Sequence, residues 1–181
     1  MDQRGIFLVG FSGTGKSTVA RLVGARLAWP VHDVDAVVVE RGGLTIPEIF
    51  EREGEAGFRR REAEALAAVS ASPPFVVATG GGAVLSEANR RLMASRGWVV
   101  ALEGRPETLH ARLARHRRQA EPDAIRPLLD AGDPLERVRT LKESRQPVYA
   151  LADWTVHTDR LTPEQVAAEV LRARELLEAT V

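Results

Sequence analysis

Residues 10–17 read Gly-Phe-Ser-Gly-Thr-Gly-Lys-Ser and match the pattern G-x-x-x-x-G-K-[ST] at every defined position. The apolar run 6–9 before them reads as a buried strand, and residues 18–27 after them carry apolar side chains at helical spacing. In a strand–turn–helix context, the glycines let the backbone bend around an anion, and the helix N-terminus aims N–H groups at phosphate oxygens. Lys16 is then placed to reach the β- and γ-phosphates and Ser17 to ligate Mg²⁺.

The lysine usage of the chain supports this interpretation. Only two of the 25 basic residues are lysines, Lys16 and Lys142, yet one of them occupies the motif position that requires a compact point charge. The alternative is a glycine-rich turn that only packs a helix against a strand. Because the motif and both flanks agree, we expect the protein to bind a nucleoside triphosphate.

Composition limits the class of protein. The 181 residues are 44% hydrophobic and 28% charged, which is typical of one globular domain spanning 1–181. The formal net charge of zero argues against nucleic-acid or membrane partners, and the absence of cysteine excludes disulfides and thiolate sites. Residues 1–5 lead directly into the first predicted strand and no apolar run approaches 18 residues, so we expect neither a signal peptide nor a membrane span. We therefore expect a cytoplasmic enzyme. As separate expectations that composition does not decide, we add a monomeric state and small-molecule substrates.

Apolar runs that predict strands alternate with segments of helical periodicity. This alternation predicts an α/β fold, with a parallel sheet covered by helices on both faces. The predicted strands are residues 6–9, 31–33, 75–78, 98–102 and 154–157. The predicted helices include a short one capped by Thr45 and Glu48, a break over 54–57, and helices at 58–69, 86–95, 105–115, 133–146 and 162–179.

Ligand sites in open α/β sheets lie beyond the carboxyl ends of the strands. Asp33 and Asp35 stand at the end of the second predicted strand, and alternation places them on the same side. One carboxylate can hold Mg²⁺ through water while the other faces a second substrate. The alternative is a pair of solvated turn aspartates.

Three glycines, Gly80, Gly81 and Gly82, follow the third predicted strand. Glycines at such a position favour a close approach between the backbone and a ligand, although a turn that requires positive φ would also explain them. The residues that follow the helix at 105–115 are polar, charged and aperiodic over 116–125. We interpret them as a mobile lid.

Arginines provide candidate anion contacts, but spacing alone cannot choose among them. Arg59, Arg60 and Arg61 are consecutive, so only one can face a given side of a helix. Arg126 ends the predicted lid, and Arg145 lies late in the helix at 133–146.

Together, six motifs in this order resemble the shikimate kinase family, and the resemblance covers essentially the whole chain. The motifs are G-x-x-G-x-G-K-S at 10–17, D-x-D at 33–35, F-R-R at 58–60, G-G-G-A-V at 80–84, R-P-L-L at 126–129 and E-S-R-x-P-x-Y at 143–149. The resemblance implies a three-layer α/β/α P-loop kinase with strand order 2-3-1-4-5, a substrate-binding region at 34–62 and a lid at 116–126. It also implies transfer of the γ-phosphoryl group of ATP to the 3-hydroxyl of shikimate.

The resemblance assigns roles to individual residues. Those implied for ATP are Gly13, Thr14, Gly15, Lys16, Ser17, Thr18, Arg126 and Arg160, with Ser17 and Asp33 holding Mg²⁺. Those implied for shikimate are Asp35, Arg59, Gly81, Gly82 and Arg145. Asp35, Lys16 and Arg126 would be catalytic: Asp35 accepts the proton of the attacking hydroxyl, and the two cations neutralise the transferred phosphoryl group.

Two departures and two rival interpretations accompany the resemblance. The segment 116–125 is longer than is usual in the family, and the approach to Arg160 is one residue shorter. A kinase for another small hydroxy acid such as gluconate is one rival; Arg59, Gly81 and Arg145 argue against it. A regulatory module that binds nucleotide without catalysis is the other, and the presence of Lys16, Asp35 and Arg126 argues against it.

Overall fold

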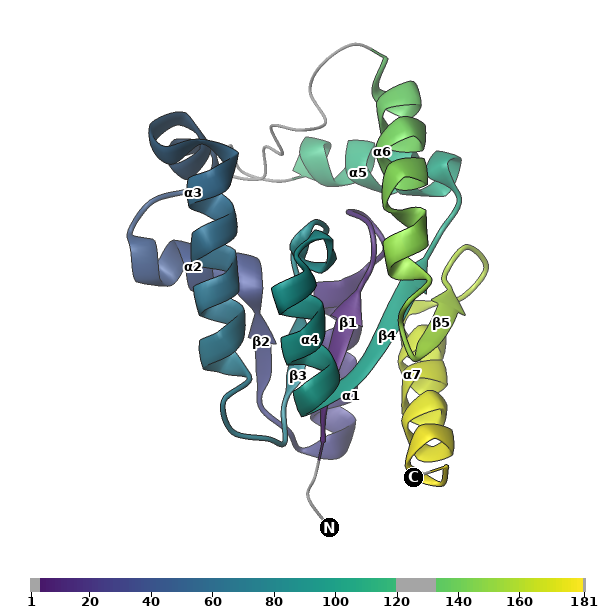
Figure 1. The fold of residues 1–181 in the computed structure, drawn as a ribbon. Helices are drawn as coiled ribbons and strands as arrows, with labels where there is room; N and C mark the ends of the chain where they lie inside the picture. Colours follow the sequence, from purple (N-terminus) through teal and green to yellow (C-terminus); the bar gives the residue numbers. More distant parts are fainter. Residues whose placement is uncertain (1–3, 120–132, 181) are drawn as a thin grey trace.

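The computed structural model describes residues 4–119 and 133–180 and is built around a five-stranded parallel sheet (Figure 1). The strand order is β2-β3-β1-β4-β5, which confirms the predicted fold class and strand order. The strands are β1 (Gly5–Val9), β2 (Val31–Asp33), β3 (Val76–Ala78), β4 (Gly97–Glu103) and β5 (Trp154–His157). β1 is central, so that Ile6 lies opposite Val76 on one side and Trp98 on the other.

Helices cover both faces of this sheet. In the view of Figure 1, α3, α4 and α6 stand in front of the sheet, α1 and α7 lie behind it, and α5 crosses above the strand ends. The helices are α1 (Lys16–Leu27), α2 (Val34–Gly42), α3 (Ile46–Val69), α4 (Glu87–Arg96), α5 (Pro106–Gln119), α6 (Pro134–Tyr149) and α7 (Pro163–Glu178), with a 3₁₀ turn, η1 (Ala83–Leu85). None of the helices within the described ranges is long and apolar enough to cross a membrane.

The pleat of the strands divides the interior into two cores. Phe7 and Val9 of β1 join the core under α2, α3, α4 and α6, whereas Ile6 and Leu8 join the core under α1 and α7. Successive side chains of a strand point to opposite faces, so a strand buried on both faces is apolar at every position. This explains why the central strand contains no polar side chain.

Helix starts follow the sequence signals. Thr45 accepts from the Glu48 N–H, and the Glu48 carboxylate accepts from the Thr45 N–H, which is the predicted capping box. Thr162 and Gln165 form the same arrangement at the start of α7. Each box satisfies backbone donors that have no partner inside the helix.

Helix interiors differ from the predictions in three places. The predicted break over 54–57 is confined to Gly54 (φ 68°, ψ −175°), and α3 continues directly after it. Gly57 is helical, and it packs closely against the Glu53 side chain instead of forming a turn. α5 continues to Gln119, so the prediction of an aperiodic segment was wrong for residues 116–119, while 120–125 lie outside the described residues. α6 runs through Pro147, where the Ala150 N–H still donates to the Gln146 carbonyl at 3.0 Å.

Candidate active site

The phosphate loop between β1 and α1 has the backbone that its glycines predict. Gly13 and Gly15 adopt φ values of 86° and 92°, which side chains with a Cβ rarely tolerate. The Lys16 ammonium donates to the carbonyls of Gly10 and Phe11 at 2.8 and 2.9 Å, so it lies folded over the loop. Thr14 is buried and its hydroxyl donates to the Phe11 carbonyl, which makes its side chain a brace of the loop.

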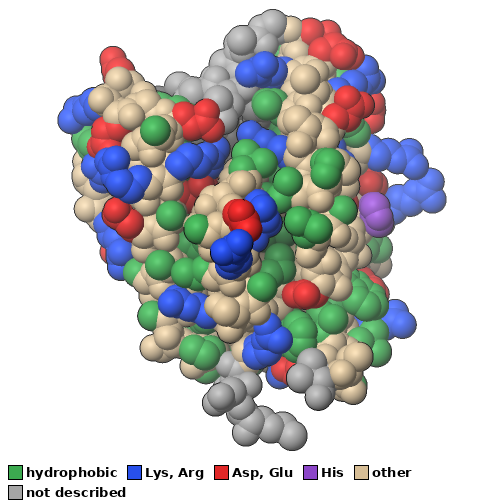
Figure 2. All heavy atoms as spheres, viewed as in Figure 1, with side chains coloured by type: hydrophobic (Ala, Val, Ile, Leu, Met, Phe, Trp, Pro, Cys, Tyr) green, Lys and Arg blue, Asp and Glu red, His purple; other side chains and the backbone are tan. Residues whose placement is uncertain are grey.

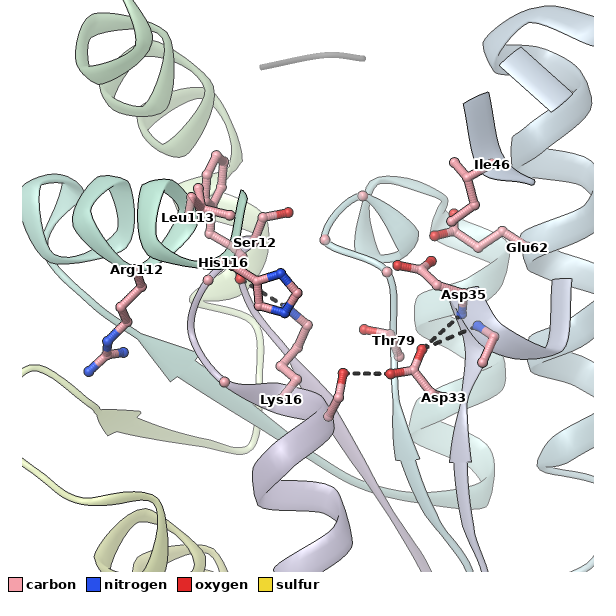
Figure 3. A pocket seen from close by; sticks show the side chains of 18 of the residues that line it. Ser12, Lys16, Asp33, Asp35, Ile46, Glu62, Thr79, Arg112, Leu113 and His116 are labelled. Atoms are coloured by element: carbon pink, nitrogen blue, oxygen red, sulfur yellow. Dashed lines mark hydrogen bonds between the residues drawn. The ribbon is translucent and has the colours of Figure 1, made fainter. Parts of the chain in front are cut away.

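The two residues predicted to hold a metal lie together. The Ser17 hydroxyl donates to one oxygen of Asp33, and the other oxygen accepts from the Asp35 N–H at 3.1 Å (Figure 3). Asp33 is thus the N-cap of α2, which fixes its carboxylate at the end of β2. A hydroxyl and a carboxylate oxygen are donors that suit Mg²⁺.

Asp35 stands beside a second carboxylate, that of Glu62 from α3, and both face the same space opposite Lys16 (Figure 3). The loop after β3 passes between them: a Cβ atom built at Gly80 would lie 2.2 Å from Glu62 Oε1 and 2.9 Å from Asp35 Oδ1. Any larger residue at this position would have to displace both carboxylates. This close approach is the reason for the first of the three glycines.

Glu62 is fully buried and pairs with Arg59 at 2.8 Å. Burial raises the pKa of the Glu62 carboxyl, and the charge of Arg59 offsets only part of that effect. Sequence reasoning missed Glu62, although a signal was present: it lies on the apolar stripe of α3, four residues from Phe58 and four from Leu66.

Among the three consecutive arginines, the structure selects Arg59. Its guanidinium lines the cavity, with Glu62 on one side and Glu55 at 3.1 Å on the other. Arg60 and Arg61 instead pair with Glu53, and neither lines the cavity. Where α3 meets the surface in Figure 2, acidic and basic side chains stand next to one another. The direction that α3 takes after the kink at Gly54 determines which of the three arginines faces the cavity.

Arg145 reaches the same cavity from α6. Only 8% of its surface is exposed, and its guanidinium carbon lies 5.6 Å from the centre of the Phe11 ring. Its Nη1 is 3.4 Å from the Gly81 carbonyl oxygen. A Cβ atom at Gly82 would lie 2.4 Å from Arg59 Nη2, so the glycine loop fills the space between the two guanidinium groups.

These groups surround one cavity of about 650 Å³ beyond the carboxyl ends of the strands. Figure 3 shows the phosphate loop and α5 on one side of it and Asp35, Glu62 and Ile46 on the other. Its apolar wall consists of Ile46, Phe50, Phe58, Leu113 and Leu141, and the rings of Phe50 and Phe58 lie 5.0 Å apart. The cavity can hold a nucleotide phosphate group beside a small acid.

The structure brings most predicted site residues into this cavity. Its lining includes Gly13, Gly15, Lys16, Ser17, Thr18, Asp33, Asp35, Arg59, Gly81, Gly82 and Arg145. Arg160 is exposed and is not among the described lining residues, and Arg126 lies outside the described residues, as do lid residues 120–125.

Two further lining residues were not predicted. Arg112 and His116 lie one turn apart on α5 and line the cavity. Arg112 also donates to the hydroxyl and carbonyl of Thr158 at 2.9 and 2.7 Å, which ties α5 to the loop after β5. Neither belongs to a short motif, so only the fold reveals them.

Comparison with known proteins gives a consistent result. The family model described as shikimate kinase matches residues 12–175. The shikimate kinase of Symbiobacterium thermophilum is 44% identical over 92% of this chain and 93% of its own, and that of Thiobacillus denitrificans is 46% identical over 86% and 81%. The solved structure of shikimate kinase from Acinetobacter baumannii in complex with shikimate superposes with a TM-score of 0.88 at 34% identity, covering 99% of this chain and 96% of that one. With its phosphate loop, paired aspartates and two inward arginines in one cavity, the chain belongs to the shikimate kinase family.

Proposed function

We propose that the protein transfers the γ-phosphoryl group of ATP to the 3-hydroxyl of shikimate, giving shikimate 3-phosphate and ADP. The observation that carries this proposal is the single cavity that joins a phosphate loop to two inward guanidinium groups and a carboxylate. A phosphoryl donor and a hydroxy acid can thus lie in contact. Family membership supports the same activity.

The nucleotide side of the cavity is the phosphate loop. We assign the backbone N–H groups of residues 13–18 and the Lys16 ammonium to the phosphates of ATP. Ser17 and Asp33 would hold Mg²⁺, which suits their oxygen donors. When bound, the ion would neutralise charge on the phosphate oxygens.

The acceptor side is formed by α2, α3, α6 and the glycine loop. Arg59 and Arg145 bind the shikimate carboxylate, because guanidinium groups match a carboxylate with two parallel hydrogen bonds. Gly81 and Gly82 bring backbone against the ring hydroxyls, while Phe50 and Phe58 exclude water from the ring. Shikimate carries both a carboxylate and hydroxyls, so the two arginines match its carboxylate and the glycine loop matches its hydroxyls.

Asp35 orients the attacking hydroxyl and accepts its proton. The carboxylate lies at the junction between the two halves of the cavity, opposite Lys16 (Figure 3). General-base assistance of this kind contributes about 10²–10⁴-fold in rate. Lys16 stabilises the charge that spreads over the equatorial oxygens of the transferred group. The contributions proposed for Arg126 to the phosphates and for Arg160 to the adenine remain predictions.

A coupled assay that measures ADP formation tests the proposal. Purified protein with ATP and Mg²⁺ is expected to form ADP rapidly with shikimate and only slowly without it. Gluconate in place of shikimate is expected to give no increase. ADP formation that is equal with and without shikimate would refute the assignment. We further propose that the protein is cytoplasmic and monomeric. Light scattering of the purified protein would test the oligomeric state.

A further inference from the structure

Tyr149, the only tyrosine of the chain, ends α6 with its ring in the core and its hydroxyl at the glycine loop. Just 1% of its surface is exposed. The hydroxyl donates to the Gly81 carbonyl at 2.6 Å. Burial raises the pKa of Tyr149 to about 12, so the phenol stays a neutral donor at physiological pH.

The same carbonyl oxygen is also approached by Arg145, one helical turn earlier on the same face of α6. The Arg145 contact is much longer, with Nη1 at 3.4 Å, which is near the outer limit for a hydrogen bond. The Nε atom of Arg145 has no hydrogen-bond partner among the described residues, although it is buried. The Tyr149 hydroxyl also accepts a hydrogen bond from Arg145, which opposes the effect of burial on its pKa. The phenol therefore occupies the Gly81 carbonyl and lies against the guanidinium, whose Nε stays available for another acceptor.

The Gly81 peptide lies between the phosphate loop and the Arg59 guanidinium, so its position influences the groups proposed to bind shikimate. A Cβ atom at Gly81 would lie 3.4 Å from the Ser12 N and Oγ atoms, so the loop rests against the phosphate loop. The next residue, Gly82, rests against the Arg59 guanidinium. In a trans peptide the carbonyl and the following N–H point in opposite directions, so fixing the Gly81 carbonyl also fixes the Gly82 N–H.

We propose that Tyr149 is a positioning residue for the acid-binding arginines: its hydroxyl holds the Gly81 carbonyl and leaves the Arg145 guanidinium available for the shikimate carboxylate. This inference rests on the proposed function. Without the hydroxyl, the unsatisfied carbonyl would attract Arg145, because a buried acceptor requires a donor. Arg145 would then bind the carbonyl instead of the substrate.

The test is the variant Tyr149→Phe, which keeps the ring in the core and removes only the hydroxyl. The KM for shikimate is expected to rise about tenfold, which is the equivalent of one hydrogen bond, while kcat and the KM for ATP stay within about twofold. The matched control is Ser70→Ala. It removes another buried hydroxyl, which donates to the Leu66 carbonyl at 2.6 Å and accepts from Arg96 Nη1 at 3.1 Å; none of these three residues lines the cavity. This control is expected to leave all three constants unchanged.

A second substrate separates positioning from a general loss of structure. With the neutral carboxamide of shikimate, Arg145 has no carboxylate to bind, so wild type and Tyr149→Phe are expected to show equal KM values. An unchanged KM for shikimate in Tyr149→Phe, or an equal rise for ATP and shikimate, would overturn the inference. A wild-type protein that does not phosphorylate shikimate at all would instead refute the proposed function.

Discussion

Replacing Gly82 with alanine moves the Arg59 guanidinium and little else. A Cβ atom at this position would lie 2.4 Å from Nη2 and 2.6 Å from Cζ of Arg59. The backbone of Gly82, with φ −106° and ψ −2°, is accessible to alanine, so no backbone strain accompanies the change. The obstacle is the end of a flexible side chain, which can retreat.

The size of the effect follows from these distances. Ordinary contact begins at 3.4 Å, so the guanidinium must withdraw by about 1 Å. A displacement of that size removes about one charge-assisted hydrogen bond to the shikimate carboxylate, which is worth about 1.5–3 kcal/mol. Because about 1.4 kcal/mol corresponds to a tenfold change, the KM for shikimate is expected to rise about 10- to 150-fold.

Steady-state kinetics with both substrates provides the assay, and Gly42→Ala provides the control. A Cβ at Gly42 would lie 2.7 Å from Nη1 of Arg61, so the control displaces another guanidinium of the same helix. Arg61 faces away from the cavity and pairs with Glu53. Gly42→Ala is therefore expected to keep the wild-type KM for shikimate. An unchanged KM for shikimate in Gly82→Ala, or an equal increase in both variants, would show that the Arg59 guanidinium does not bind the shikimate carboxylate.

Asp35→Asn should retain ATP affinity, measured by calorimetry, but lose turnover on the order of a hundredfold or more; near-normal turnover would reduce Asp35 to a positioning role. Arg145→Lys should raise the KM for shikimate about tenfold or more without changing the affinity for ATP. The control Arg60→Lys, at an arginine that does not line the cavity, should change neither the KM for shikimate nor the affinity for ATP. A loss of ATP affinity in Arg145→Lys would show that Arg145 binds the nucleotide instead. Burial raises the pKa of the Glu62 carboxyl in the folded protein, so the stability that this carboxyl contributes is present below its ordinary pKa of 4.5 and is lost as the pH rises through the raised folded-state pKa. The Tm of Glu62→Gln relative to that of wild type should therefore increase between pH 4 and pH 7. A Tm difference that does not vary with pH would contradict this.

The architecture was predictable because its signals are local. Each strand buried on both faces is a continuous apolar run, as in Ile6–Val9, and each such run became a strand. The phosphate loop was predictable because its glycines, lysine and flanks are contiguous. The break in α3 was predicted too wide, because Gly54 and Gly57 look alike in sequence but serve a turn and a close packing contact respectively.

The site was predictable only in part, because several of its contacts join distant segments. Spacing could not choose Arg59 from its two neighbours, since the choice depends on how the helix turns after Gly54. No local sequence pattern predicts that Glu62 lies beside Asp35 or that the Tyr149 hydroxyl donates to the Gly81 carbonyl. For Arg160 the resemblance implied a nucleotide contact, and the residue is exposed outside the described cavity lining.

The proposed reaction in this cavity transfers the γ-phosphoryl group to one hydroxyl of shikimate. Phosphorus NMR of the products formed by purified protein from ATP, Mg²⁺ and shikimate tests that claim directly, because phosphorus–proton coupling identifies the carbon that bears the phosphate. We expect one new phosphomonoester resonance, coupled to the proton at position 3, in an amount equal to the ADP formed. Release of inorganic phosphate without a phosphomonoester, or a phosphomonoester at another position, would contradict it.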